Sequence, residues 1–217
     1  MVVMSISVAF ISLFVIPILI AIIVTVAVTV AVTAPLRGLA PVIGPRTRLL
    51  VLGSFPGVAS LQAQQYYGHP RNHFWPLVGA LWQVDLKPLA YAERIAWLLD
   101  QGLGLWDVYA SCRRVGSLDS AIRDAKLNDL AGLRLLAPAL GAVAHNGGES
   151  ARAMRHTRAL GVPVFRLPSS SPANASWTFA RKLEAWRAAA LGAGLPLPLP
   201  LPLQPLPLSS TGEKDQP

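Results

Sequence analysis

The stretch from Gly53 to Trp75 concentrates residue types that can hold a nucleotide. It reads GSFPGVASLQAQQYYGHPRNHFW, a Gly/Pro-rich loop followed by tyrosines, a histidine, an arginine and an asparagine. Aromatic rings stack on bases, arginine binds phosphate, and asparagine offers a donor and an acceptor to a base edge or to water. The pattern favours a nucleotide pocket, although an ordinary packed turn would use the same residue types equally well.

Strands and helices are predicted to alternate along the chain. The apolar patterns predict strands at 49–52, 103–108, 141–145 and 162–167, and helices at 72–84, 89–101, 127–137, 149–160 and 177–191. This alternation predicts an α/β domain with a central, mainly parallel sheet. Ligands bind beyond the carboxyl ends of parallel strands, so we expect the loops 53–56, 146–148 and 168–174 to gather at one edge.

The excess of positive charge lies in the middle of the chain. Residues 46–187 contain 17 Lys+Arg and 9 Asp+Glu, and this difference equals the net charge of +8 of the whole chain. A basic balance of this size favours a polyanionic partner such as DNA or an anionic membrane surface. Most of the cations are arginines, whose guanidinium groups suit bidentate phosphate contacts.

Both ends of the chain differ in composition from this middle part. Residues 8–34 form an uncharged apolar run, longer than the roughly 20 residues that a bilayer needs. The run predicts a transmembrane helix, with the arginines that follow it on the cytoplasmic side; a start codon assigned too far upstream is the alternative. We therefore expect an apolar segment at 1–36, a linker at 37–45, a folded domain at 46–191 and a disordered Pro/Leu-rich tail at 192–217.

The sequence does not predict a metal centre or a disulfide. Cys112 is the only cysteine, and the histidines are scattered without the spacing of a metal site. Four of the aspartates in the middle part could suggest a metal or acid-pair site, but they lack convergent ligand spacing and we expect no catalytic role for them; they are Asp107, Asp119, Asp124 and Asp129.

Several ordered motifs resemble the uracil-DNA glycosylase superfamily. Phe55-Pro56-Gly57 and the segment 67–75 (YGHPRNHFW) follow the layout of the mismatch-specific uracil/thymine glycosylases, and resemble the hypoxanthine-active branch more closely. Further matching pieces are LWDV at 105–108, GSLDSAI at 116–122, ND at 128–129, NGG at 146–148 and LPSSSPA at 167–173. The resemblance covers about residues 46–188.

The resemblance implies a three-layer α/β/α fold and a monofunctional DNA glycosylase. Such an enzyme hydrolyses the N-glycosidic bond of a deaminated base, hypoxanthine or uracil, in DNA and needs no cofactor. We expect a monomer in the cytoplasm beside the nucleoid, or a catalytic domain anchored to the membrane through residues 8–34. A lyase mechanism requires a nucleophilic amine, and Lys87, Lys126 and Lys182 all lie outside the motifs.

The resemblance also implies roles for individual residues. Asn72 is expected to position water or contact the base, although the residue alone would suit a cap of the following helix. Tyr67 is expected to stack on the extruded base and His69 to act as an acid, although a tyrosine that covers the core and a structural histidine would look the same. The expected pocket wall consists of Gly53, Ser54, Phe55 and Gly57. Arg71, Ser169, Ser170 and Ser171 are expected to bind DNA, although a generic Ser/Pro loop would look the same.

This chain departs from the superfamily pattern at two positions. Phe55 stands where the uracil/thymine enzymes have the asparagine that positions the hydrolytic water. Leu167 stands where a histidine or asparagine often stabilises the leaving base. A catalytically degenerate protein that binds damaged DNA is therefore the alternative function.

Overall fold

The computed structural model describes residues 17–18 and 34–199. The expected apolar segment 8–34 lies outside the described residues except for 17, 18 and 34, and so does the tail from residue 200 onward. Among the described residues, no helix is both long enough and apolar enough to cross a membrane.

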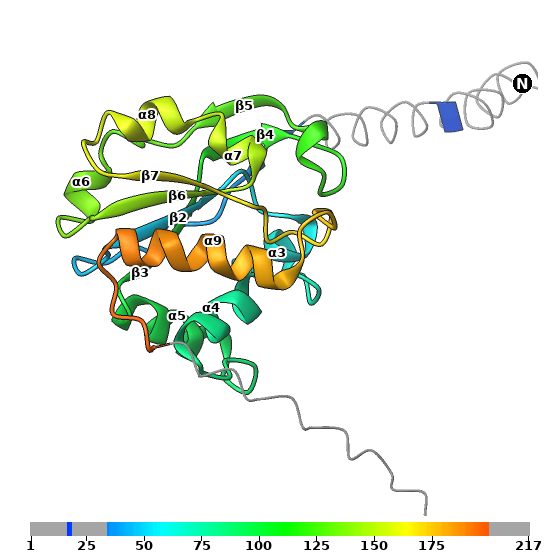
Figure 1. The fold of residues 1–217 in the computed structure, drawn as a ribbon. Coiled ribbons are helices and arrows are strands. Elements are labelled where there is room, and N and C mark those ends of the chain that lie inside the picture. Colours follow the sequence, from blue (N-terminus) through cyan, green and yellow to red (C-terminus); the bar gives the residue numbers. More distant parts are fainter. Residues whose placement is uncertain (1–16, 19–33, 200–217) are drawn as a thin grey trace, which may run out of the picture.

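A four-stranded parallel sheet forms the centre of the molecule (Figure 1). Its strands are β2 (Leu49–Gly53), β3 (Leu103–Asp107), β6 (Ala142–Asn146) and β7 (Val164–Leu167), in the order β3-β2-β6-β7. All three pairings are parallel, which confirms the predicted sheet. Parallel strands covered on both faces are continuously apolar, as LLVL in β2 is.

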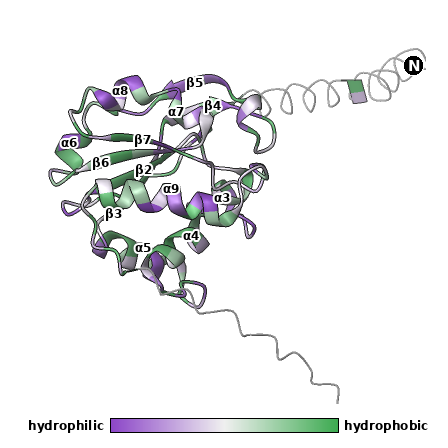
Figure 2. Ribbon diagram, in the orientation of Figure 1, coloured by the Kyte–Doolittle hydropathy of each residue, from purple (hydrophilic) through white to green (hydrophobic). Residues whose placement is uncertain are grey.

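Helices cover both faces of this sheet. Leu49 and Val51 pack on the side of α4 (Phe74–Trp82), α5 (Tyr91–Asp100) and α9 (Phe179–Gly192). Leu50 and Leu52 pack in a second cluster, on the side of α6 (Leu133–Leu136), α7 (Gly148–Ala151) and α8 (Met154–Arg158). Figure 2 shows the strands of the sheet as mostly hydrophobic, whereas α8 and β5 are hydrophilic. The three-layer arrangement is confirmed.

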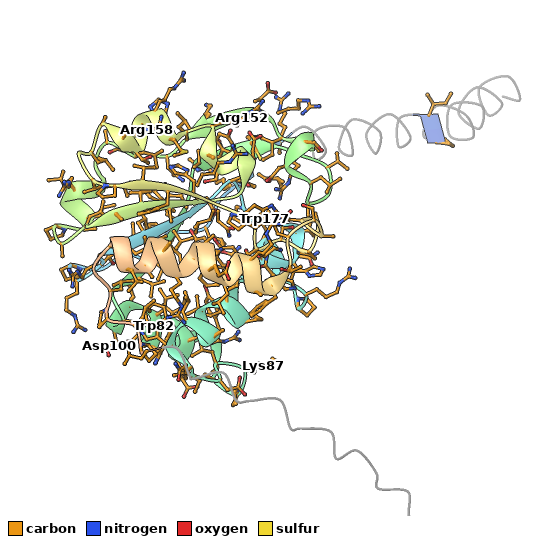
Figure 3. The ribbon with its side chains drawn as sticks, in the orientation of Figure 1. Trp82, Lys87, Asp100, Arg152, Arg158 and Trp177 are labelled. Atoms are coloured by element: carbon orange, nitrogen blue, oxygen red, sulfur yellow. The ribbon has the colours of Figure 1, made fainter. Side chains whose placement is uncertain are left out.

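Side chains fill the space between the sheet and its helices (Figure 3). Arg152 and Arg158 project from the outer surface on the side of α7 and α8, and Lys87 and Asp100 lie on the opposite side of the molecule. These four charged side chains thus lie at outer surfaces of the molecule, away from the sheet.

A second sheet, which the sequence did not predict, lies beside the first. Its antiparallel strands are β1 (Leu36–Arg37), β4 (Tyr109–Arg113) and β5 (Arg123–Leu127), in the order β1-β4-β5. The sequence of β5, RDAKL, has no alternation of apolar and polar residues that would predict a strand. In the structure every residue of β5 is exposed.

Two predicted helices differ from the structure. The helix expected at 127–137 is wrong over most of its length, because β5 ends at Leu127 and α6 covers only Leu133–Leu136. Asp129 Oδ1 accepts the Gly132 N–H at 3.0 Å, a local turn that competes with helix at this point. The helix expected at 149–160 is divided into α7 and α8.

The segments on either side of the predicted domain also pack against it. In residues 37–45, expected as a linker, the Val42 N–H donates to Leu105 O at 2.8 Å, and Ala40 O accepts the Tyr66 hydroxyl at 3.1 Å. After α9, Leu195 is 3% exposed and belongs to the core. The described part of the domain therefore extends beyond residues 46–191 in both directions.

Candidate active site

A cavity of about 790 Å³ lies at the carboxyl ends of the central strands. The loops after β2 and β7 contribute to it together with the last residues of β3 and β6, Asp107 and Asn146, which confirms that these strand ends gather at one edge. Each residue singled out from the sequence lines this cavity: Gly53, Ser54, Phe55, Gly57, Tyr67, His69, Arg71, Asn72, Ser169, Ser170 and Ser171. Their proximity is thus a feature of the structure, while their individual roles stay predictions.

Asp107, the last residue of β3, lies deep in this cavity. It is 4% exposed, and its Oδ2 atom has no hydrogen-bond partner among the described residues. Burial raises the pKa of the carboxyl to about 7, with a further increase from Asp119 that Arg114 partly opposes. Near neutral pH a substantial fraction of Asp107 is therefore a neutral carboxylic acid, which can donate a hydrogen bond.

The Asp107 carboxyl lies directly against the backbone of Gly53. A Cβ atom at Gly53 would overlap Asp107 Oδ1, whereas a Cβ atom at Gly57 would lie 3.4 Å from Ser117 Oγ, an ordinary contact. The two glycines of the GSFPG stretch thus have different steric demands.

We expect Gly53→Ala to destabilise the protein by about 1–3 kcal/mol, because the added methyl group displaces a buried carboxyl. Gly57→Ala is the matched control and should change the free energy of unfolding by less than about 0.5 kcal/mol. Urea unfolding of both variants measures the difference. Equal effects of the two substitutions would contradict the proposed contact with Asp107.

Tyr67 forms an aromatic wall of the cavity. Its ring stacks on Phe74 with centroids 3.9 Å apart and an angle of 11° between the planes. Its hydroxyl accepts a hydrogen bond from Asn146 Nδ2 at 3.2 Å. The residue has a φ of 55°, a left-handed conformation that is uncommon for tyrosine and occurs preferentially at functional sites.

Asn146, at the end of β6, holds two parts of the site together. Besides Tyr67, its Nδ2 donates to Ser170 Oγ at 2.9 Å, and its Oδ1 accepts the Ser170 N–H at 2.9 Å. Ser170 is 1% exposed, so its hydroxyl faces inward and is already bonded. Ser169 and Ser171 are half-buried and leave more of their surface open to a ligand.

Replacing Asn146 by alanine is expected to lower the free energy of unfolding by about 1–3 kcal/mol, because the buried Ser170 N–H loses its acceptor. Ser171→Ala, in the same loop as Ser170, is expected to change the free energy of unfolding by less than about 0.5 kcal/mol. Thermal or urea unfolding compares the two. A stability of Asn146→Ala equal to that of Ser171→Ala would refute this role of Asn146.

Asn72 combines a structural contact with an available donor. Its Oδ1 accepts the N–H of Phe74, the first residue of α4, at 2.9 Å. Among the described residues, its Nδ2 has no hydrogen-bond partner, and Asn72 lines the cavity. His69 Nδ1 accepts the Arg71 N–H at 3.2 Å, which leaves Nε2 as the ring atom that can act on a ligand.

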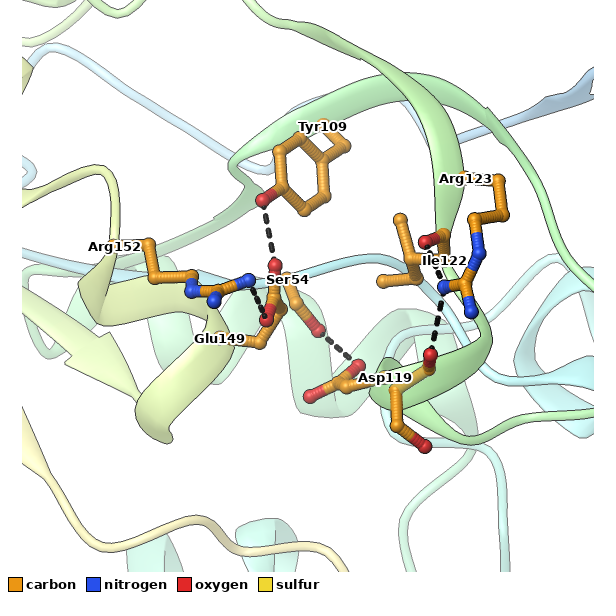
Figure 4. A network of polar contacts seen from close by, with 8 residues as sticks. Ser54, Tyr109, Asp119, Ile122, Arg123, Glu149 and Arg152 are labelled. Carbon is orange, nitrogen blue, oxygen red and sulfur yellow. Dashed lines mark hydrogen bonds and ion pairs between the residues drawn. The ribbon is translucent and has the colours of Figure 1, made fainter.

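Residues 117–120 also line the cavity, as does the loop 168–174 after β7, here called the serine loop. Ser54 Oγ donates to Asp119 Oδ1 at 2.7 Å, and the Val58 N–H donates to Ser117 Oγ at 2.9 Å. Figure 4 shows Asp119 held to Ser54, next to the pair formed by Tyr109 and Glu149. The pocket wall at Ser54 is thus tied to a segment far along the chain.

Comparison with known proteins identifies the family. The profile of the Uracil DNA glycosylase superfamily matches residues 40–190. This chain belongs to the uracil DNA glycosylase superfamily. A hypoxanthine DNA glycosylase from Methanosarcina acetivorans is 39% identical over 152 residues, which cover 70% of this chain and 96% of the relative. A hypoxanthine DNA glycosylase from Methanosarcina barkeri is 41% identical over 138 residues, 64% of this chain and 87% of the relative.

A solved structure agrees with this assignment. The solution NMR structure of a protein from M. acetivorans, described as a candidate uracil DNA glycosylase, aligns with a TM-score of 0.65 at 36% identity. The alignment covers 72% of this chain and 99% of that protein. The predicted fold class and superfamily are therefore confirmed.

The sequence did not predict some polar residues at the site of this superfamily member. Asp107 and Asp119 line the cavity, although no site role was expected for either. Their signal was local: each belongs to a superfamily-like motif, LWDV or GSLDSAI, and Asp107 is the polar last residue of an otherwise apolar strand. The described residues contain no group of three or more His, Cys, Asp or Glu side chains that could hold a metal ion.

Proposed function

We propose that this protein is a monofunctional DNA glycosylase that removes a deaminated base, hypoxanthine or uracil, from DNA. Superfamily membership and the names of the two Methanosarcina relatives support the reaction class. The proposal includes a monomeric enzyme that acts in the cytoplasm, where its DNA substrate is.

The buried acid in an aromatic-walled cavity is the observation that carries the proposal. Tyr67 offers a ring on which an extruded base can stack, with stacking worth on the order of 1–3 kcal/mol. Deamination replaces an exocyclic amino group by a carbonyl oxygen. The neutral carboxyl of Asp107 donates a hydrogen bond to such an oxygen, whereas an amino group would leave that donor unpaired.

Asn72 would position the water molecule for hydrolysis. The water oxygen bonds to C1′ of the deoxyribose and releases a proton to solvent, while the C1′–N bond breaks and its electron pair leaves with the base. His69 lies in the same cavity; it would pass a proton to the departing base and regain one from solvent. Arg71, Ser169 and Ser171 would hold the phosphates on either side.

The position of the lysines supports hydrolysis rather than a lyase step. No lysine is among the described residues that line the cavity. Lys182 is fully buried in α9, and its Nζ donates a hydrogen bond to Asn174 O at 3.0 Å. It therefore supports the end of the loop 168–174 and does not line the cavity. An amine nucleophile is thus lacking in the described lining of the pocket.

The test uses the full-length protein and labelled duplexes that contain hypoxanthine, uracil or a thymine mismatch. We expect strand cleavage only after alkali treatment, because a monofunctional enzyme leaves an abasic site. Cleavage without alkali would refute the monofunctional mechanism. Tight binding to a lesion without any cleavage would instead favour a damage-binding protein, consistent with the apolar residues Phe55 and Leu167 at polar positions of the superfamily.

A further inference from the structure

Arg114, the residue after β4, lies behind the wall of the cavity rather than in it. Its guanidinium carbon lies over the ring of Phe55, 5.1 Å from the ring centroid, and its Nη2 donates to Pro56 O. Phe55 and Pro56 line the cavity, whereas Arg114 is not among the described residues that do so. Arg114 therefore acts on the cavity only through other residues.

The guanidinium of Arg114 is incompletely paired. Its Nε and Nη1 atoms are buried and have no hydrogen-bond partner among the described residues. A buried cation with unpaired N–H groups costs stability, and an uncharged side chain of the same length would pack at a lower cost. The positive charge at this position therefore indicates a role beyond packing.

The same charge acts on two carboxyl groups of the cavity. The Asp107 carboxyl lies against Gly53, at the start of the loop whose Pro56 carbonyl Arg114 holds. Burial and Asp119 raise the pKa of Asp107, and Arg114 lowers it. The pKa of Asp119 is raised by burial and by Glu149, and it is lowered by the hydrogen bond from Ser54 and by Arg114. Arg114 thus favours the ionised form of both carboxyls.

The other ionisable groups that face Asp107 are two tyrosines. Burial, with a smaller contribution from the Asp107 carboxyl, raises the pKa of the Tyr66 and Tyr67 hydroxyls above the ordinary value. Both tyrosines are therefore neutral near pH 7. The ionisation of Asp107 is thus a balance between burial and Asp119, which oppose it, and Arg114, which favours it.

We propose that Arg114 is a positioning residue for base excision, which acts through the Phe55–Pro56 wall and through its positive charge on Asp107. This inference rests on the proposed glycosylase function. The wall fixes where the extruded base lies. The charge makes Asp107 a stronger acid than burial alone would leave it, and a donor whose acidity matches the working pH best stabilises the negative charge that grows on the leaving base.

The experiment measures kcat and kcat/KM from pH 6 to pH 9 for full-length wild type and two variants of Arg114. Arg114→Met keeps the length of the side chain without its charge. We expect its kcat to fall about tenfold, because the wall is displaced. The decrease of kcat/KM with pH should also begin at a higher pH, so that the ratio of kcat/KM at pH 8 to that at pH 6 rises about threefold or more.

Two further variants separate charge from packing. Arg114→Lys keeps the charge without the planar group, so its kcat should fall while its pH profile stays near that of wild type. Arg113→Met is the matched control, because Arg113 is the neighbouring arginine, exposed and paired with Asp124 at 3.5 Å outside the cavity. The control should keep both the rate and the pH profile of wild type.

A lower kcat in Arg114→Met with an unmoved pH profile would leave Arg114 a purely structural role and overturn the inference. A displaced profile in Arg114→Lys would do the same, because the charge would then not be the cause. This second outcome decides the matter even if Arg114→Met does not fold.

Urea unfolding gives a readout that needs neither DNA nor activity. Without the cation the pKa of Asp107 in the folded protein should be higher, so the free energy of unfolding of Arg114→Met should continue to decrease up to a higher pH than that of wild type. The same pH dependence of unfolding in both proteins would refute the coupling. If wild type excises no base and this difference in unfolding is present, the coupling of Arg114 to Asp107 stands and the glycosylase function fails.

Discussion

Replacing Asn72 by alanine is expected to lower kcat/KM for base excision on the order of 10²–10³-fold. Asn72 is proposed to orient the attacking water, and positioned groups that assist proton transfer or attack contribute factors of this size. Single-turnover excision measures the loss, and binding of the lesion duplex should change far less. An excision rate close to that of wild type would remove Asn72 from the mechanism.

The alanine variant alone does not separate chemistry from folding. Asn72 Oδ1 also accepts the Phe74 N–H, and loss of such a cap costs about 1 kcal/mol of stability. Asn72→Ser is the control, because its hydroxyl can still accept that N–H while the amide donor is lost. We expect the serine variant to unfold like wild type and to excise slowly. Full excision activity in the serine variant would mean that Asn72 acts only as a cap.

The stability of the protein is expected to fall as pH rises toward 8, with Asp107 as a main cause. Its pKa is about 7 in the folded protein and 3.8 in a model peptide, so the folded state binds more protons between these pH values. The free energy of unfolding therefore decreases across this window and levels off above it. From pH 5 to 8 the contribution of Asp107 is about 2–3 kcal/mol.

Asp107→Asn removes this titration while keeping the size of the side chain. Urea unfolding at pH 5 and pH 8 should show a smaller decrease in the variant than in wild type. Burial raises the pKa of Asp119 as well, but that titration remains in both proteins. Asp124→Asn, at an exposed carboxyl paired with Arg113, should keep the wild-type pH dependence. Identical pH dependence of wild type and Asp107→Asn would contradict a raised pKa at Asp107.

The same titration has a consequence for activity. If the neutral Asp107 carboxyl donates to the carbonyl oxygen of the base, kcat/KM should fall as pH rises through about 7. The side-chain amide introduced by Asp107→Asn retains an N–H donor, so this variant is expected to remain active with a flatter pH profile. Asp107→Leu, which has no donor, should be inactive across the whole range.

The strands of the central sheet could be predicted because each is a short apolar run ended by a turn. Leu49–Leu52 is fully buried and stops at Gly53, and β3 is likewise buried along its whole length. β7 (VFRL) shows the weakest pattern, because it is only partly buried and contains the exposed Arg166. The small antiparallel sheet could not be predicted in this way. β5 is exposed along its whole length, so it is specified by pairing with β4 rather than by burial.

The site was predictable as a set of loops but not as a network. Topology alone places the residues after β2, β6 and β7 together, because carboxyl ends of parallel strands share an edge. The contacts of Asn146 with Ser170 and Tyr67 depend on tertiary geometry. The LWDV motif could have drawn attention to Asp107, but its raised pKa depends on burial in the folded protein, which the motif alone does not reveal.

The distribution of the cavity along the chain has a consequence for folding kinetics. Its lining extends from Gly53 to Asn174, and the parallel strands that hold it pair only through long crossovers. Such non-local contacts form slowly, since loop closure must precede the pairing. During refolding, helices such as α5 and α9 can appear early, while recovery of excision must wait for β7 to dock. Return of activity should thus lag behind return of helical circular dichroism.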